Sequence, residues 1–203
     1  EDIDMVFIRE NTEGAYVGAH GFTHKGQPNE VATQVLVYTR AGVERAIRYA
    51  FELARERNKR KQVTLIDKAN AVRAQDIWTR VFAEVAKEYA GVEADHLDVA
   101  SRAMRSVTDP RQVEVVVTCD MFGDIVTDLG AALQGGLGMA ASGNIHPGEV
   151  SMFEPVHGSA PKYAGTDTAN PFGAILTAGM MLAHTGLPEA AAAIEAAVME
   201  SLE

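Results

Sequence analysis

Two aspartates, Asp124 and Asp128, lie four residues apart in a segment expected to start a helix. At this spacing both carboxylates face the same way, and like charges so placed repel unless a cation lies between them. Hard oxygen ligands favour Mg²⁺ or Mn²⁺ over zinc. The alternative is that acidic residues simply favour the positive end of a helix, which accounts better for Asp124 than for Asp128.

A lysine, Lys68, follows a short apolar segment in the run Ile66-Asp67-Lys68-Ala69-Asn70. This pattern predicts a lysine at the carboxyl end of a parallel strand, where α/β proteins bind their ligands. An amine that is desolvated there can act as a base. The alternative is a lysine that only marks the exit of the strand into solvent.

Arg9 and Tyr16 flank a glycine-containing bend. An arginine at the end of a buried strand can bind a carboxylate through two parallel hydrogen bonds. A tyrosine seven residues later can return to the same cleft as a proton donor. The alternative is an arginine at the rim and a tyrosine that only packs, which is the commoner situation for single residues.

The segment 153–165, with the sequence FEPVHGSAPKYAG, is followed by Asn170-Pro171. It matches neither the GxGxxG nor the Walker pattern. Gly158 lets the backbone approach a ligand closely, and a lysine next to a tyrosine at 162–163 suits a phosphate. For His157 alone, the alternative is a structural histidine.

Alternating strands and helices must position these residues. Runs of β-branched and aromatic residues predict strands, and an apolar period of 3.6 residues predicts helices. Their alternation indicates an α/β fold. Strands are predicted at 4–8, 15–24, 31–39, 63–66, 113–118 and 150–156, and helices at 40–57, 71–90, 99–107, about 123–133, 171–184 and 188–202.

Composition excludes several classes of function. The 203 residues carry 18 Lys and Arg against 28 Asp and Glu, and a net charge of −10 argues against a nucleic-acid partner. No apolar run reaches the roughly 18 residues of a membrane-spanning helix, so no membrane partner is expected. The single cysteine, Cys119, cannot form a disulfide within this chain and is compatible with a cytoplasmic location.

Together, the four segments resemble the isocitrate/3-isopropylmalate dehydrogenase family of β-hydroxyacid oxidative decarboxylases. The resemblance runs from residue 4 to 202. It implies a two-domain α/β fold in a homodimer, with active sites between domains and shared between subunits. Residues 1–135 would be the second, dimerising domain with a β-hairpin arm at about 15–39, and residues 136–203 the C-terminal part of the first, cofactor-side domain. The motifs are RENTEGAY at 9–16, IDKANAV at 66–72, FGDIVTDL at 122–129 and FEPVHGSAP at 153–161.

The resemblance also implies roles for individual residues. Arg9 would hold the substrate carboxylate, Tyr16 would protonate carbon after CO₂ leaves, and Lys68 would take the hydroxyl proton in the partner subunit's site. Asp124 and Asp128 would bind Mg²⁺ or Mn²⁺. Residues expected to bind NAD or NADP are Asn70, Glu154, His157, Gly158, Ser159, Ala160, Lys162, Tyr163 and Asn170.

Three positions depart from the family pattern. A third metal aspartate is expected before the 113–118 strand, but ungapped alignment places Ala100 there, and Asp98 lies two residues earlier as the remaining candidate. Asp120 stands where the family more often has asparagine. At 162–163, Lys-Tyr replaces the Asp-Ile of NAD-dependent relatives, which favours NADP because a cation and a hydroxyl can accept a 2′-phosphate.

The expected activity is therefore oxidative decarboxylation of a 2-hydroxy-dicarboxylate. The ENTEGAY segment favours 3-isopropylmalate, a substrate of leucine biosynthesis, while isocitrate, homoisocitrate and tartrate stay open. A hypothesis of another class is a catalytically silent fragment that dimerises through its arm. The start Glu1-Asp2-Ile3-Asp4 is not a signal peptide and predicts that the chain begins inside a longer protein.

Overall fold

The computed structural model describes residues 3–202. Residues up to Leu129 form one compact unit and residues from Gly130 form a second. The expected domains, 1–135 and 136–203, concern the whole protein and stay a prediction; their residues 1, 2 and 203 lie outside the described part of the chain.

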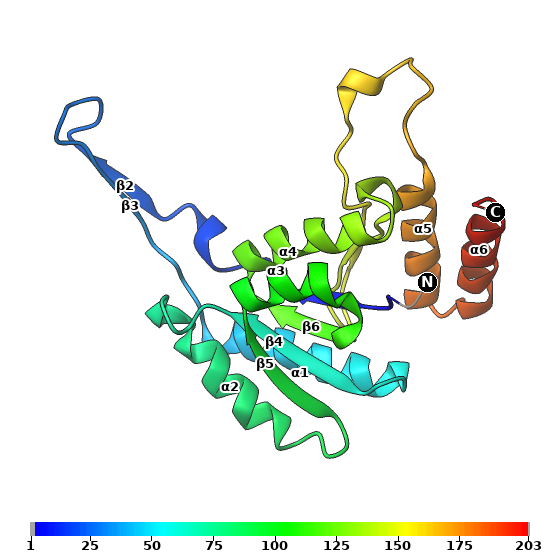
Figure 1. The fold of residues 1–203 in the computed structure, drawn as a ribbon, viewed down its shortest axis with the longest axis horizontal. Coiled ribbons are helices and arrows are strands. Elements are labelled where there is room, and N and C mark those ends of the chain that lie inside the picture. Colours follow the sequence, from blue (N-terminus) through cyan, green and yellow to red (C-terminus); the bar gives the residue numbers. More distant parts are fainter. Residues whose placement is uncertain (1–2, 203) are drawn as a thin grey trace. The chain divides into compact units, whose positions relative to one another are not determined.

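A parallel sheet organises the first unit (Figure 1). Its strand order is β1-β6-β4-β5. The register pairs Arg9 with Thr118 and Asp67 with Asp98, so the carboxyl ends of the strands share one edge. The mixed α/β class predicted from the sequence is confirmed. The strands are β1 (Val6–Arg9), β4 (Gln62–Asp67), β5 (Glu93–Asp98) and β6 (Val115–Thr118).

Helices cover both faces of this sheet. Helices α1 (Arg40–Arg57) and α2 (Asp76–Ala86) lie on one face, and α3 (Val99–Thr108) lies on the other (Figure 1). Every residue of β4 is buried, as expected for a central strand covered on both sides. Alternate β4 side chains therefore enter two separate apolar clusters.

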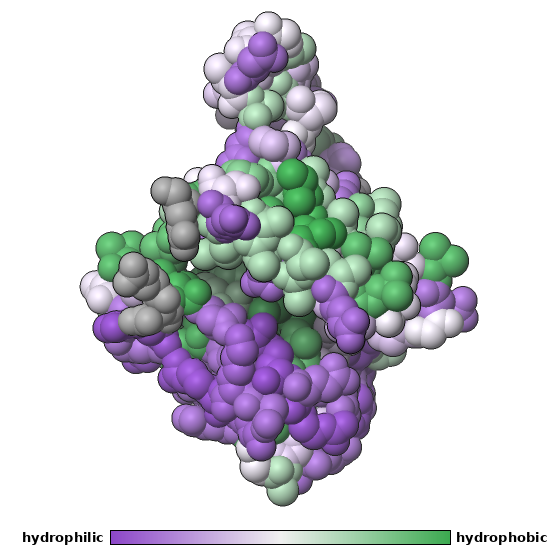
Figure 2. Space-filling view, turned by 90° about the vertical axis from the view of Figure 1, so that its right-hand side faces the viewer, coloured by the Kyte–Doolittle hydropathy of each residue, from purple (hydrophilic) through white to green (hydrophobic). Residues whose placement is uncertain are grey.

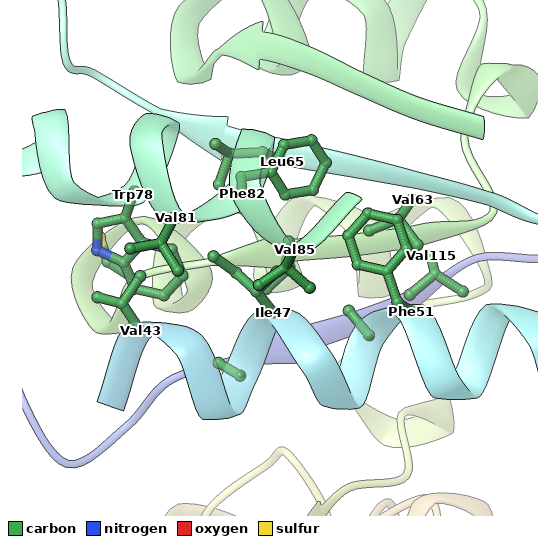
Figure 3. Packing of buried hydrophobic residues seen from close by; sticks show 14 of the residues in the cluster. Val43, Ile47, Phe51, Val63, Leu65, Trp78, Val81, Phe82, Val85 and Val115 are labelled. Carbon is green, nitrogen blue, oxygen red and sulfur yellow. The ribbon is translucent and has the colours of Figure 1, made fainter. Parts of the chain in front are cut away.

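The larger cluster lies between α1, α2 and the sheet. Figure 3 shows Val43, Ile47 and Phe51 of α1 directed toward α2 and the strands. The Phe51 ring is tilted against Phe82, with centroids 5.4 Å apart, and stacks on Tyr89 at 5.0 Å. This close packing fixes α1 and α2 relative to the strands whose ends carry the candidate site.

The ends of α1 agree with the predicted helix. The Thr39 hydroxyl accepts a hydrogen bond from the Gly42 amide at 3.1 Å and caps the N-terminus. Asn58 adopts a left-handed conformation with φ 48° at the C-terminus. These caps explain why the helix starts directly after the segment that leads from the hairpin.

The predicted hairpin is present but shorter than expected. Its strands, β2 (His20–Thr23) and β3 (Val31–Gln34), pair antiparallel. Residues Ala15–Val17 form a 3₁₀ turn, so the strand predicted from residue 15 was wrong at its start. Beyond β3, Val37 makes only an isolated bridge with Gly14. The glycine at φ 96° bends the chain and prevents a continuous strand.

The second unit is mainly helical. Helix α4 (Asp120–Leu133) begins in the first unit and continues past its boundary. Large apolar side chains of α5 (Phe172–His184) and of the turn after it are exposed, among them Met180, Met181 and Leu187. Figure 2 shows apolar residues, coloured green, gathered on one face of the molecule. The remaining elements are β7 (Gly143–Asn144), β8 (Met152–Phe153), α5 (Phe172–His184) and α6 (Pro188–Glu200).

Several predicted bounds were wrong. The helix expected at 71–90 is a 3₁₀ turn (Arg73–Gln75) followed by α2, and the strand expected at 150–156 is only the two residues of β8. Strand β5 was not predicted, because its polar sequence has no apolar alternation. Across the described part of the chain, no helix combines the length and hydrophobicity needed to span a membrane.

We expect Val81→Ala to lower the free energy of unfolding by about 2 kcal/mol, because two buried methyl-sized groups are lost and a cavity remains. Val81 is fully buried in the large cluster, beside the single tryptophan of the chain, Trp78. Urea denaturation followed by tryptophan fluorescence measures the change. Val150→Ala, the same substitution at a side chain that is 92% exposed, is the control and should stay within about 0.5 kcal/mol of the parent.

Candidate functional site

The carboxyl edge of the parallel sheet gathers candidates that are distant in the sequence. Arg9 ends β1, Lys68 directly follows β4 and Asp98 ends β5. Helix α4 starts two residues after β6 and carries both predicted metal ligands. This edge is where parallel α/β sheets place ligands.

The Arg9 guanidinium is held between two carboxylates of α4. Asp120 Oδ1 lies 2.8 Å from Nε and 2.7 Å from Nη2, while Asp124 Oδ1 lies 2.9 Å from Nη1. The Asp120 side chain is only 6% exposed, whereas that of Asp124 is 50% exposed. Asp120 is therefore the buried anchor of Arg9, and Asp124 is the partner that faces solvent.

Tyr16 joins this cluster from the 3₁₀ turn after β1. Its hydroxyl donates a long hydrogen bond of 3.4 Å to Asp124 Oδ2. Desolvation, followed by the negative charge of Asp124, raises the pKa of Tyr16 above its ordinary value. This environment disfavours the phenolate, and the phenol, which is protonated at neutral pH at its ordinary pKa as well, can donate a proton.

A glycine makes the contact between β1 and α4 possible. A Cβ atom on Gly123 would lie 2.6 Å from Arg9 Cγ and 2.9 Å from Arg9 Cδ. The arginine side chain thus crosses α4 where that helix has no side chain. Any larger residue at 123 would displace Arg9 from its two carboxylates.

Two glutamates hold the segment between Arg9 and Tyr16. The buried Glu10 carboxylate accepts hydrogen bonds from the backbone amides of Thr12 and Glu13, and it pairs with Arg45 of α1 at 3.0 Å. Glu13 accepts a hydrogen bond from the Thr39 amide at 2.7 Å. These contacts tie the bend to the start of α1 and so set the place from which Tyr16 projects.

Lys68 follows β4, which pairs with β6, the strand that precedes Asp120 and Asp124. Hydrogen bonds hold the backbone of Lys68 in place. Its amide donates to the side-chain oxygen of Gln75 at 2.6 Å, and its carbonyl accepts from the amides of Ala71 and Val72. Within residues 3–202, the partly buried Lys68 side chain forms no ion pair.

The sequence predicted that the metal candidates Asp124 and Asp128 lie at the start of a helix, and this prediction was wrong. Helix α4 begins at Asp120, so Asp124 lies in its second turn and Asp128 one turn later, exposed. Among the residues that the structure describes, no three His, Cys, Asp or Glu side chains are grouped as a metal site. Asp98 Oδ2 instead accepts a hydrogen bond from the side-chain Nδ2 of Asn70 at 3.2 Å. Ala100, the residue at the ungapped position, is exposed on α3.

The cofactor candidates other than Asn70 belong to the second unit. Glu154 accepts a hydrogen bond from Asn144 at 3.2 Å, and Asn170 Oδ1 accepts from the Phe172 amide at 2.9 Å at the start of α5. His157 Nε2 is buried without a hydrogen-bond partner among the described residues. The other candidates, Gly158, Ser159, Ala160, Lys162 and Tyr163, are all exposed.

This loop is shaped by close approaches and by an unusual backbone. A Cβ on Gly173 would lie 3.2 Å from the His157 ring, so α5 can approach the ring only at a glycine. Ala160 has φ 42°, a left-handed conformation that alanine rarely adopts, and it leads into the 3₁₀ turn of Pro161–Tyr163. Such a backbone conformation costs free energy, which the surrounding loop must offset.

The structure adds three residues to the predicted set. Asp120 was noticed only as a departure from a family pattern, and Gln75 and Gly123 were not singled out. No local signal predicted Gln75, because its partners lie up to 44 residues away. Gly123 was predicted only as the first residue of a helix at about 123–133, and the earlier start of α4 at Asp120 places it inside the helix, where glycine usually needs a packing reason.

Comparisons with known proteins agree with these arrangements. A family model described as isocitrate/isopropylmalate dehydrogenase matches residues 1–203. The 3-isopropylmalate dehydrogenases of Thermobifida fusca (strain YX) and Frankia casuarinae are 54% and 51% identical, over 100% and 98% of this chain. The chain spans only 58% and 59% of the length of these relatives.

A solved structure gives the same result for the fold. The crystal structure of isocitrate dehydrogenase from Methylococcus capsulatus matches with a TM-score of 0.92 and 43% identity, over 98% of this chain and 58% of that chain. The family model covers all 203 residues, and the parallel sheet with its motif-bearing edge has the expected form. This chain belongs to the isocitrate/isopropylmalate dehydrogenase family.

Proposed function

We propose that the protein to which this chain belongs catalyses the NAD(P)- and divalent-metal-dependent oxidative decarboxylation of 3-isopropylmalate. Two relatives that are more than half identical to this chain carry the name 3-isopropylmalate dehydrogenase. The observation that carries the proposal is the cluster of Arg9, Asp124 and Tyr16, formed from three separate segments at the carboxyl edge of the sheet. A reaction in leucine biosynthesis and a cytoplasmic location belong to the same proposal.

The residues present fit a divalent cation. Asp124 and Asp128 offer carboxylate oxygens one helical turn apart, and both side chains reach solvent. Mg²⁺ typically takes one or two carboxylates and completes its octahedron with water and substrate oxygens, so a pair is sufficient. Asp98 is a further candidate ligand, separate from this pair. Its carboxylate accepts a hydrogen bond from the side chain of Asn70.

The residues of the second unit fit a dinucleotide. Gly158 has no atom within 4 Å of the position of a Cβ, so a ligand can approach the backbone there. His157 belongs to the same loop, but its Nε2 is buried against Gly173, so the exposed Lys162 and Tyr163 are the side chains open to a ligand. The Lys162 ammonium lies over the Tyr163 ring at 4.7 Å. This cation and hydroxyl suit a 2′-phosphate, which favours NADP over NAD.

The chain's own residues supply binding and proton transfer. A divalent cation held by Asp124 and Asp128 would supply Lewis acidity toward the substrate hydroxyl and carboxylate, and a nicotinamide held by the second unit would supply the hydride acceptor. Arg9 binds the substrate carboxylate, for which it gives up part of its contact with Asp124. Lys68 removes the hydroxyl proton, and Tyr16, whose phenol is protonated at neutral pH, delivers a proton to carbon after CO₂ has left.

A second copy of the chain is the proposed partner. The hairpin β2–β3 exposes apolar side chains, among them Phe22 at 49% and Val31 at 52%. Burial of these side chains in a homodimer would remove them from water. In such a dimer, Lys68 acts in the partner subunit's site, which agrees with an ammonium that forms no ion pair within the described residues.

A substrate panel tests the activity. The whole protein, assayed with Mg²⁺ and either cofactor, should oxidise 3-isopropylmalate with a higher kcat/KM than isocitrate, homoisocitrate or tartrate, and chelation with EDTA should abolish turnover until Mg²⁺ or Mn²⁺ is restored. Turnover of isocitrate but not 3-isopropylmalate would contradict the substrate assignment. Failure of the whole protein with every substrate would favour the catalytically silent dimerisation module.

Lys68→Ala should lower kcat by about 10²–10⁴-fold, because general-base catalysis typically contributes that much. The oligomeric state, measured by light scattering, should not change, since only the backbone of Lys68 is bonded within the unit. Lys87→Ala, at an exposed lysine after α2, is the matched control. Parent-like activity of Lys68→Ala would refute the role of the base.

Tyr16→Phe should lower kcat by about 10²-fold or more with little change in KM, because the proton donor is lost and the substrate contacts remain. In the parent, ultraviolet titration should give Tyr16 a pKa above the ordinary value of tyrosine. Asp124→Asn should lower that pKa toward the ordinary value, because the neighbouring negative charge disfavours the phenolate. An unchanged Tyr16 titration in Asp124→Asn would contradict the contact between these side chains.

A further inference from the structure

A buried amide side chain lies directly behind the proposed base. Gln75 is fully buried and belongs to the 3₁₀ turn before α2. Its Oε1 accepts a hydrogen bond from the backbone N–H of Lys68, with 2.6 Å between nitrogen and oxygen. Its Nε2 donates to Tyr38 Oη at 3.1 Å and to Cys119 Sγ at 3.2 Å. Both ends of the Gln75 side chain therefore have partners, and its position is fixed from three directions.

The two partners of Gln75 Nε2, Tyr38 and Cys119, lie next to the segments that carry Tyr16 and Asp120. Cys119 follows β6 and directly precedes Asp120, the buried anchor of Arg9. The Tyr38 ring lies 3.5 Å from the position of a Cβ on Gly14, in the bend that carries Tyr16. Gln75 thus connects the backbone of the proposed base to the segments that hold the proposed acid and Arg9.

Neighbouring contacts leave the Lys68 backbone little freedom. Its carbonyl accepts from Val72 at 2.7 Å and from Ala71 at 3.0 Å, and the Asp67 carboxylate accepts from the Ala69 amide at 3.0 Å. The Tyr38 ring meets Trp78 of α2 edge to face, with centroids 6.4 Å apart, which fixes the Tyr38 hydroxyl. Among these hydrogen bonds of the Lys68 backbone with residues 3–202, the one to Gln75 is the shortest and comes from a side chain.

We propose that Gln75 is a positioning residue for catalysis, which fixes the backbone of Lys68 at the edge of the sheet, and with it the direction of the Lys68 side chain, through the Tyr38–Gln75–Cys119 hydrogen-bond network. This inference rests on the proposed function of Lys68 as the base. Gln75 does not touch substrate; it acts through the backbone of Lys68. Displacement of a catalytic group by about 1 Å can cost about 10²-fold in rate, so loss of this anchor should be visible in kcat.

The test compares three variants of the whole protein. Gln75→Met keeps the shape but removes both the acceptor and the donors. Gln75→Glu keeps an oxygen for the Lys68 amide and is the conservative variant. Gln62→Met is the matched control, because Gln62 is a buried glutamine at the opposite end of β4 whose Oε1 has no partner among the described residues.

Two measurements are made on each variant: steady-state kinetics with the best substrate of the panel, and hydrogen–deuterium exchange of a peptide that covers residues 66–72. Gln75→Met should lower kcat by about 10–100-fold with KM changed less than about threefold, and should accelerate exchange at the Lys68 amide at least about tenfold. Gln75→Glu should recover most of the slow exchange and of kcat. Gln62→Met should change neither quantity.

Each contrary result has a distinct meaning. Unchanged exchange in Gln75→Met would overturn the anchor, and accelerated exchange with parent-like kcat would overturn its role in positioning. A lower kcat and a faster exchange in Gln75→Met that Gln75→Glu does not reverse would overturn the specific contact with the Lys68 amide. Inactivity of the parent protein would refute the proposed function instead, and the exchange measurement would still decide whether Gln75 anchors Lys68.

Discussion

The arrangement of the first unit depends on one buried ion pair, between Arg9 at the end of β1 and Asp120 at the start of α4. The carboxylate is almost fully buried, so its charge needs the guanidinium within hydrogen-bond distance. The pair is possible because Gly123 leaves room for the arginine side chain. It determines the direction of Arg9 and therefore the side on which Asp124 and Tyr16 meet it.

This ion pair also affects the electrostatics of the proposed site. One positive guanidinium faces two carboxylates, so the group of Arg9, Asp120 and Asp124 carries an excess of one negative charge when all are ionised. A cation near Asp124 is favoured by that excess, whereas an anionic substrate is favoured only once such a cation is present. An asparagine at 120 would leave Arg9 with a single carboxylate, so Asp120 shifts the balance toward cation binding.

Periodic segments were predictable from the sequence, and contacts between distant segments were not. The apolar period of α1 and the β-branched run of β6 predicted these elements closely, because burial on one face or on both leaves a pattern. Strand β5 was missed, because Glu93–Asp98 is polar and becomes a strand only by pairing with β4. Tyr16 and Asp124 were named from motifs, but their contact joins residues 108 apart and depends on the whole sheet. The roles of Gln75 and Gly123 depend on packing that no local pattern encodes.

Strand β1 pairs with β6 on one side and is, with β5, one of the two edge strands of the described sheet. Its outer backbone groups are a template for strand addition. In a preparation of these 203 residues alone, this edge favours strand-to-strand self-association. Sedimentation of the isolated chain would report that artefact, and quaternary structure is better judged from the full-length polypeptide.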